Sequence, residues 1–186
     1  MSTNKLGGYS AFTPYKEAEK EVQAYFLEVT KQLVGVNFTP LAVAQQVVNG
    51  INFAYFTTAK GTYSEARYYN ALVIVHVATT GAVTLTEVKP VQPVKGSGEG
   101  LAGGYTAFLP IDDSPIPAIL LEKVGAGVSY TPLAIASQVV AGVNYAIFAE
   151  AKIVYPEAVP YNVILTLFRD LEGAYYLTHI ERVEII

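Results

Sequence analysis

The chain contains two copies of one unit, and this repeat limits the possible folds more than any other feature. The segment Thr39–Ala42 recurs as Thr131–Ala134, 92 residues later (39 to 131), and nearly half of the positions that follow are identical in the two copies. Upstream, Gly7–Phe12 recurs as Gly103–Phe108, so the second copy lacks about four residues between the two blocks. Each copy must therefore complete its fold within about 90 residues, which is the size of a small domain.

A stretch rich in Gly and Ser separates the copies. Residues 93–100 read Pro-Val-Lys-Gly-Ser-Gly-Glu-Gly and show no apolar periodicity, which is typical of a flexible tether. We predict a first domain at residues 1–92, a linker at 93–100 and a second domain at 101–186.

Each copy begins with a predicted helix. In Tyr15–Leu33, apolar residues recur at spacings of three and four while charged residues occupy the rest of the circumference, which indicates an amphipathic helix. In the second copy, Ser114 and Pro115 form a plausible cap and first turn, and Ile119–Val124 continues a shorter helix.

The remainder of each copy reads as β-strands. In the first copy they are expected at Phe38–Gln46, Ile51–Lys60, Tyr68–Ala78 and Ala82–Val91, with equivalents in the second copy. Asn49-Gly50 is a strong signal for a tight hairpin turn, and Ala141-Gly142 is a weaker one. The fold class we predict is α+β: in each copy a four-stranded antiparallel meander, extended by the Gly-Gly-Tyr segment as an edge strand, wraps around one helix.

Composition excludes several classes of function. The chain has no Cys and two His residues, His76 and His179, at unrelated positions of the repeat. Disulfides and thiolate sites are therefore impossible, and we expect packed or surface histidines, no metal, no cofactor and no catalytic residues. The net charge of -4 leaves no basic stripe, so nucleic acid is not an expected partner.

Hydropathy and the amino terminus bear on location. Polar residues interrupt every apolar run well before the roughly 18 residues that a membrane span needs, so we expect a soluble protein without a membrane partner. Met1–Leu6 lacks the basic start and apolar core of a secretory signal. As written, the protein is expected to be cytoplasmic, or secreted if the chain is a processed form.

The predicted first hairpins carry a family resemblance. Gln138–Gly142 reads Gln-Val-Val-Ala-Gly, which resembles the Gln-Xaa-Val-Xaa-Gly signature of the cystatin superfamily, and Gln46–Gly50 repeats it as Gln-Val-Val-Asn-Gly. A Gly pair precedes the helix in both copies, as it does near the amino terminus of cystatins. The resemblance spans nearly the whole of each copy and implies two tandem cystatin-like domains.

The resemblance implies a reversible inhibitor of papain-like cysteine proteases. Cystatins insert the residues before the Gly pair, the first hairpin and the second hairpin into the protease cleft without offering a bond for cleavage. The implied contact residues are Leu6, Gly7, Gly8, Gln46, Val47, Val48, Asn49, Gly50, Gly103, Gly104, Gln138, Val139, Val140, Ala141 and Gly142, with Leu101 as the counterpart of Leu6. Self-association by strand exchange at the hairpin is also a property of such units.

Other interpretations remain open at each feature. The valines could simply alternate on a strand, and the Gly pairs could form a bulge at an edge strand. The pairs Tyr68-Tyr69 and Tyr175-Tyr176 could bind a sugar or peptide, or cover the sheet. The chain has no Trp, so its second hairpins lack the aromatic anchor usual in cystatins. The alternative function is a non-inhibitory interaction module on the same fold.

Overall fold

The computed structural model describes residues 8–93, 103–111 and 114–183. The chain divides into two compact units, of which the first ends at Val91 and the second begins at Gln92. Residues 94–100 of the predicted linker lie outside the described part of the chain.

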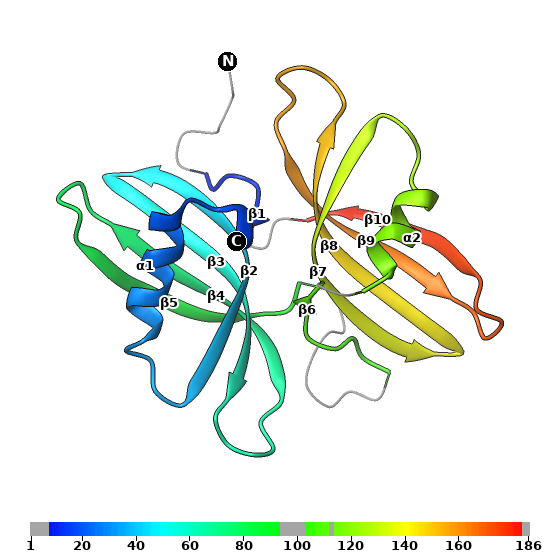
Figure 1. Cartoon of the computed structure of the whole chain (residues 1–186), viewed down its shortest axis with the longest axis horizontal. Coiled ribbons are helices and arrows are strands. Elements are labelled where there is room, and N and C mark those ends of the chain that lie inside the picture. Colours follow the sequence, from blue (N-terminus) through cyan, green and yellow to red (C-terminus); the bar gives the residue numbers. More distant parts are fainter. Residues whose placement is uncertain (1–7, 94–102, 112–113, 184–186) are drawn as a thin grey trace. The chain divides into compact units, whose positions relative to one another are not determined.

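Each unit is a five-stranded antiparallel sheet with one α-helix, an α+β arrangement (Figure 1). The first unit contains β1 (Thr13–Pro14), a 3-10 helix (Tyr15–Glu17), α1 (Lys20–Thr30), β2 (Val36–Val48), β3 (Gly50–Gly61), β4 (Tyr68–Val77) and β5 (Val83–Val91). The second contains β6 (Leu109–Pro110), α2 (Ile116–Lys123), β7 (Val128–Val140), β8 (Gly142–Ile153), β9 (Tyr161–Arg169) and β10 (Tyr175–Arg182). The strand orders are β1-β2-β3-β4-β5 and β10-β9-β8-β7-β6, so the four long strands of each sheet form a meander.

In the first unit, α1 packs on one face of the sheet through its apolar side. Phe26 and Val29 are buried there, and the Phe26 ring centroid lies 5.0 Å from that of Tyr55 on β3. The Tyr55 hydroxyl donates a 2.6 Å hydrogen bond to the carbonyl oxygen of Val22, and burial raises the pKa of Tyr55 far above its usual range. Apolar contact and this hydrogen bond together hold the helix on the sheet.

In the second unit, the shorter helix packs in the same way. Ile116 and Leu120 of α2 are buried in one cluster with Ile147 on β8 and Leu165 on β9. The helix begins at Ile116, directly after the predicted cap and first-turn pair Ser114 and Pro115, and Pro117 is tolerated in a first turn whose N–H groups have no helical partner. The Ser114 hydroxyl accepts a 3.3 Å hydrogen bond from the Ile116 amide.

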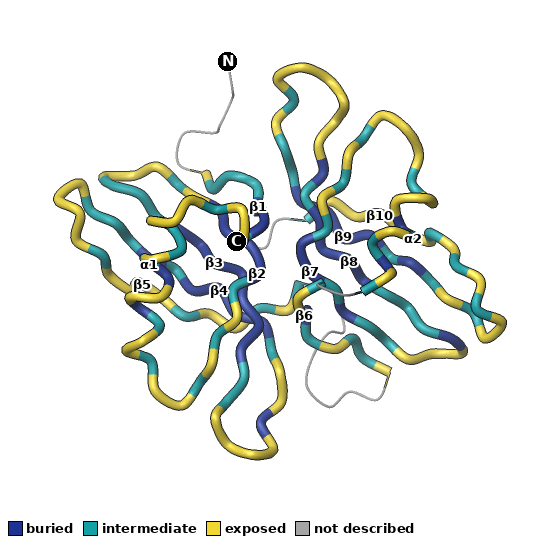
Figure 2. Tube along the Cα trace, in the orientation of Figure 1, coloured by how far each residue is buried: buried dark blue, intermediate teal, exposed yellow. Residues whose placement is uncertain are grey.

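The opposite face of each sheet also carries large apolar side chains. Phe12, just before β1, lies edge to face on Phe56 of β3, with ring centroids 6.3 Å apart. Phe108 and Phe148 repeat this contact in the second unit, also at 6.3 Å. Figure 2 shows the result: the middle parts of the long strands are buried, whereas the hairpin ends are exposed.

The predicted long helix and the predicted edge strand differ from the observed ones. Ala18 and Glu19 adopt extended backbone, which divides the predicted Tyr15–Leu33 helix into a 3-10 turn and α1. The regular edge strands form at Thr13–Pro14 and Leu109–Pro110, after the Gly-Gly-Tyr segments, in which Tyr105 makes an isolated β-bridge. Both strands are short because proline has no N–H to extend a ladder. None of the described helices is long and apolar enough to cross a membrane.

Candidate functional site

The candidate site is the end of each sheet where the first hairpin closes. In the first unit, β2 and β3 pair as far as Val48 opposite Gly50, and Asn49 alone connects them. The second unit repeats this with Val140 opposite Gly142 around Ala141. Among the described residues the only non-glycine with positive φ is Glu157, so Asn49 does not adopt the type I′ conformation that the Asn-Gly signal predicts.

The paired valines next to this turn are exposed. Val47 and Val139 expose 71% and 75% of their surface, and the following Val48 and Val140 are also exposed. The described residues of their own unit leave most of the Val47 and Val139 side chains uncovered, although a valine on a two-sided sheet would normally be buried. The other exposed residues of β2 and β7 are polar, so exposed apolar side chains distinguish the hairpin tip from the rest of each strand.

Steric constraints explain why a glycine follows each turn. Gly142 is buried with φ +122°, and a Cβ atom there would overlap the Arg169 carbonyl oxygen of β9 and lie 2.8 Å from the Phe168 ring. Gly50 has φ +108° and lies in the same way against Val77 and His76 of β4. These two glycines therefore shape the hairpin and bring it against the neighbouring strand, rather than presenting surface themselves.

The glutamine that opens each motif braces the hairpin. Asn52 donates a 2.9 Å hydrogen bond from Nδ2 to Gln46 Oε1 across the β2–β3 pair, and Asn144 does the same to Gln138, also at 2.9 Å. Gln138 Nε2 in turn donates to the carbonyl oxygen of Gly103. In the second unit, one side chain thus joins the first hairpin to the Gly-Gly segment.

The segments after the Gly pairs run beside the first strand of each hairpin. The Ser10 amide donates a 2.8 Å hydrogen bond to the Gln45 carbonyl oxygen, and Thr106 makes the same bond to Ser137. Burial raises the pKa of Tyr105, and a hydrogen bond with the Thr166 side chain partly opposes this shift. Of the residues implied by the resemblance, Gly103 is joined to the hairpin through Gln138, and Gly8 and Gly104 come two residues before Ser10 and Thr106. Leu6, Gly7 and Leu101 lie outside the described residues.

The second hairpin of the second unit adds residues that are not among the contact residues implied by the resemblance. Leu171 lies in the β9–β10 connection and exposes 83% of its surface. Asp170 accepts hydrogen bonds at Oδ1 from the amides of Glu172 (3.0 Å) and Ala174 (2.8 Å). These bonds hold the pKa of Asp170 below its usual range, the bond from Ala174 having the largest effect. An Asp three residues before Gly173 was the sequence signal for this turn.

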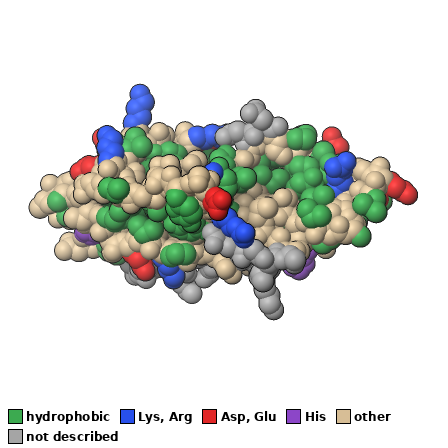
Figure 3. All heavy atoms as spheres, turned by 90° about the horizontal axis from the view of Figure 1, so that it is seen from below, with side chains coloured by type: hydrophobic (Ala, Val, Ile, Leu, Met, Phe, Trp, Pro, Cys, Tyr) green, Lys and Arg blue, Asp and Glu red, His purple; other side chains and the backbone are tan. Residues whose placement is uncertain are grey.

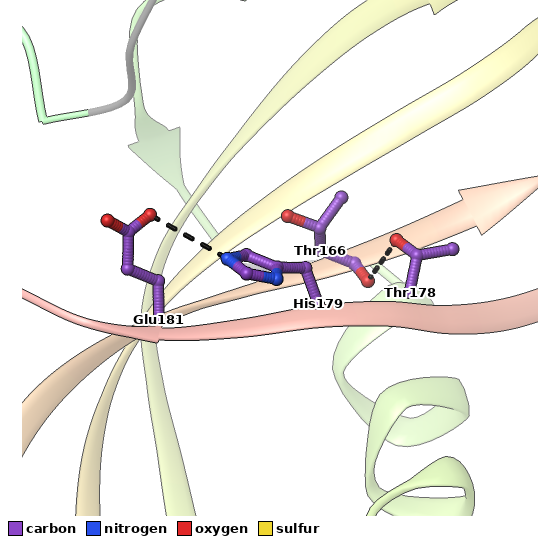
Figure 4. A network of polar contacts seen from close by, with 4 residues as sticks. All are labelled: Thr166, Thr178, His179 and Glu181. Atoms are coloured by element: carbon purple, nitrogen blue, oxygen red, sulfur yellow. Dashed lines mark hydrogen bonds and ion pairs between the residues drawn. The ribbon is translucent and has the colours of Figure 1, made fainter.

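The histidines have different environments. The His76 Nδ1 atom lies 2.8 Å from Asn52 Oδ1, so this half-buried ring continues the Gln46–Asn52 row on to β4. His179 is exposed on β10, and its Nε2 atom lies 3.9 Å from the Glu181 carboxylate (Figure 4). Beside it, Thr178 donates a 3.1 Å hydrogen bond to the Thr166 carbonyl oxygen. His76 is therefore packed and His179 lies at the surface, the two situations expected for single histidines.

Each tyrosine pair has one half-buried and one exposed member: Tyr69 and Tyr175 are half-buried, whereas Tyr68 and Tyr176 are exposed. Tyr175 stacks on Tyr145, with centroids 6.5 Å apart, and packs against the core cluster of the second unit. Tyr176 stacks on Phe168 at 6.4 Å. Tyr68 is 49% exposed, and the Lys60 ammonium group lies 4.7 Å from its ring centroid.

Charged side chains are dispersed. On the face shown in Figure 3, Lys and Arg side chains lie apart from one another among apolar and polar surface. Within the described residues, no group of three His, Asp or Glu side chains is placed to hold a metal ion. The hairpin edge is therefore the candidate site, because it carries the Gln-Val-Val-Xaa-Gly sequence in both units.

Comparison with known proteins adds no family assignment: no protein-family model matches the chain, and no curated protein matches it significantly.

Proposed function

We propose that the chain is a two-headed, reversible inhibitor of papain-like cysteine proteases, built from two cystatin-like units. The observation that carries the proposal is the exposed valine pair at the closed end of each first hairpin, at 71% for Val47 and 75% for Val139. Exposed apolar side chains gain free energy only when a partner covers them. Covering one such valine contributes about 2 kcal/mol, which is roughly a 30-fold change in Kd.

The mechanism is steric. The hairpin tip enters the protease cleft, covers the catalytic thiolate and excludes substrate, while its own backbone is held away from attack. This requires a narrow and rigid edge. The single-residue turn makes it narrow, and the Gln138–Asn144 hydrogen bond across the strands supports its rigidity, so little conformational entropy is lost on binding.

Three further features support the cystatin-like assignment. Each unit has one helix on the face of a meander of four long strands. The Gln-Val-Val-Xaa-Gly sequence falls on the first hairpin of both units. The described part of the Gly-Gly segment lies at the same edge, joined in the second unit through Gln138.

The test is a titration of papain, counted by its active sites, with the whole chain. We expect two enzymes to be bound per chain, one at each head. Replacing Val139 and Val140 by Asp should reduce the stoichiometry to one, because two charges at the tip cannot be desolvated in the cleft. The pair Val47→Asp and Val48→Asp should act in the same way on the first head.

Matched controls lie at the other end of each sheet. Val34, before β2, and Val154, after β8, are as exposed as the hairpin valines. Val34→Asp and Val154→Asp should leave inhibition unchanged, which separates loss of a contact from a general effect of added charge. Unchanged inhibition by the hairpin variants would refute the assignment of the edge, and no inhibition by the parent chain at micromolar concentration would refute the function.

A second candidate is a non-inhibitory interaction module, favoured by the β8–β9 connection. Ile153, Val154, Tyr155 and Val159 are all exposed there, at the end of the sheet opposite the first hairpin. At the equivalent positions the first unit has Gly61, Thr62, Tyr63 and Arg67, of which only Tyr63 is a large exposed apolar residue. Binding of a partner that survives the hairpin substitutions but is lost with Val154→Asp would support this function.

A further inference from the structure

We propose that the two heads are not equivalent, and that in the second unit Asp170 positions Leu171 as an apolar anchor that makes this head the tighter binder. This inference rests on the proposed function. It concerns how the two units divide that function, and it follows from comparing two loops that share one backbone geometry.

The loops after β4 and β9 have the same backbone. In the first unit the Ala78 amide donates a 2.9 Å hydrogen bond to the Ala82 carbonyl oxygen, and in the second the Asp170 amide donates one of 3.0 Å to Ala174. The glycines within these loops, Gly81 and Gly173, have φ of +85° and +93°. Differences between the loops therefore come from their side chains.

Those side chains differ in hydrophobicity, which is the property that matters for a contact surface. Leu171 is 83% exposed, whereas its counterpart in the first unit is the small polar Thr79. Next to these positions, Glu172 corresponds to Thr80. One exposed leucine on a surface needs no explanation. Here, however, it lies on the connection next to the exposed valine hairpin, because Gly142 packs against the carbonyl oxygen of Arg169, the residue before this loop.

Asp170 fixes the loop that presents Leu171. Its Oδ1 accepts bonds from the Glu172 and Ala174 amides, on either side of the loop tip, and its Oδ2 accepts a 3.2 Å bond from the Tyr176 hydroxyl. In the first unit Ala78 occupies this position and has no side-chain acceptor. A braced loop loses less entropy on binding than a loop held by backbone bonds alone.

The partner that fits the second head follows from this chemistry. Its cleft must offer an apolar wall to Leu171 beside the surface that covers Val139 and Val140, and a basic side chain there would pair with Glu172. The first head presents only small, uncharged polar side chains at the same place. It therefore binds the same protease more weakly.

The experiment measures each head separately in the full chain. Val47→Asp with Val48→Asp silences the first head, and Val139→Asp with Val140→Asp silences the second. We expect the chain that keeps only the second head to bind papain about tenfold more tightly than the chain that keeps only the first, since a buried leucine contributes about one factor of ten more than threonine. Leu171→Thr should remove this difference, and Thr79→Leu should strengthen the first head.

Asp170 is tested as a positioning residue. Asp170→Ala should weaken the second head mainly through faster dissociation and should speed hydrogen exchange at the Glu172 and Ala174 amides. Asp170→Asn should restore most of the affinity, because its amide oxygen can still accept both bonds. Rescue by Asn would not be expected if only the charge of Asp170 mattered.

The outcomes separate the two proposals. Equal affinities of the two single-headed chains, with no effect of Leu171→Thr, would overturn the inference while leaving the inhibitory function in place. Failure of the parent chain to bind papain would overturn both.

Discussion

Replacing Gly142 by Ala should destabilise the second unit more than replacing Gly173, although both residues have positive φ. Gly142 lies at φ +122° and Gly173 at +93°, so each alanine variant carries a backbone penalty of about 1–3 kcal/mol. At Gly142 the new Cβ also meets the Arg169 carbonyl oxygen and the Phe168 ring, 2.8 Å away, whereas nothing lies within 4 Å of a Cβ at Gly173. Moving these groups adds about 1–3 kcal/mol for Gly142 alone.

The assay is urea unfolding of the whole chain, followed by circular dichroism. The difference between the two variants isolates the steric contribution, because their backbone penalties cancel approximately. The first unit provides an independent repeat of the comparison, with Gly50→Ala against Gly81→Ala, since Gly50 lies against Val77 and nothing lies within 4 Å of Gly81. Equal losses within each pair would show that the hairpin does not pack on the neighbouring strand, and would refute our explanation of the motif glycine.

Three further predictions concern the core and the second hairpin. Phe26→Ala should lower the free energy of unfolding by about 3–5 kcal/mol, because Phe26 is 1% exposed. Leu27→Ala, on the outer side of α1, should change that free energy by less than about 0.5 kcal/mol. Urea titration measures both variants, and similar losses would contradict the orientation of the helix. Tyr55→Phe should cost about 1 kcal/mol through loss of the bond to Val22, and no loss by the same measurement would contradict that bond. The lowered pKa of Asp170 stabilises the fold at pH values above the ordinary Asp pKa, and this contribution is lost as pH falls through the lowered value. NMR titration of Asp170 checks the direction, and an ordinary or raised pKa would contradict the loop bonds.

Much of the fold could be predicted because the two copies report the same pattern. The strand predictions, such as Ile51–Lys60 against the observed Gly50–Gly61, agree within one or two residues. Alternating side chains and turn residues are local signals, and they fix strand ends well. The helix start was predicted less well, because the apolar spacing of Ala18, Val22 and Phe26 fits a helix while Ala18 itself is extended. The backbone at Ala18 depends on how this residue packs against the sheet, and the spacing of apolar residues in the sequence carries no information about that packing.

The candidate site was predicted in part. The exposure of the hairpin valines follows from their place beside a turn, which the sequence indicates. The Gln46–Asn52 and Gln138–Asn144 bonds were missed, although each pair is placed symmetrically about its turn and therefore lies directly opposite on the two strands. The contact of Gly142 with Arg169 could not be predicted, because it joins residues far apart in sequence and depends on the order of strands in the sheet.

Duplication within one chain separates what the fold requires from what a partner would require. The Gln–Asn bond and the positive-φ glycine recur at equivalent positions with the same geometry, and each has a structural cause, so their repetition needs no partner to explain it. The valine pairs also recur, but they are exposed in both units and are not among the buried core residues of either one. Leu171 and Thr79 occupy equivalent positions in loops with the same backbone hydrogen bond, so the fold accepts either residue there. Exposed apolar residues that both units keep therefore indicate the function that the two units would share. Residues that differ between the units at positions of the same backbone geometry indicate where their partners or affinities differ.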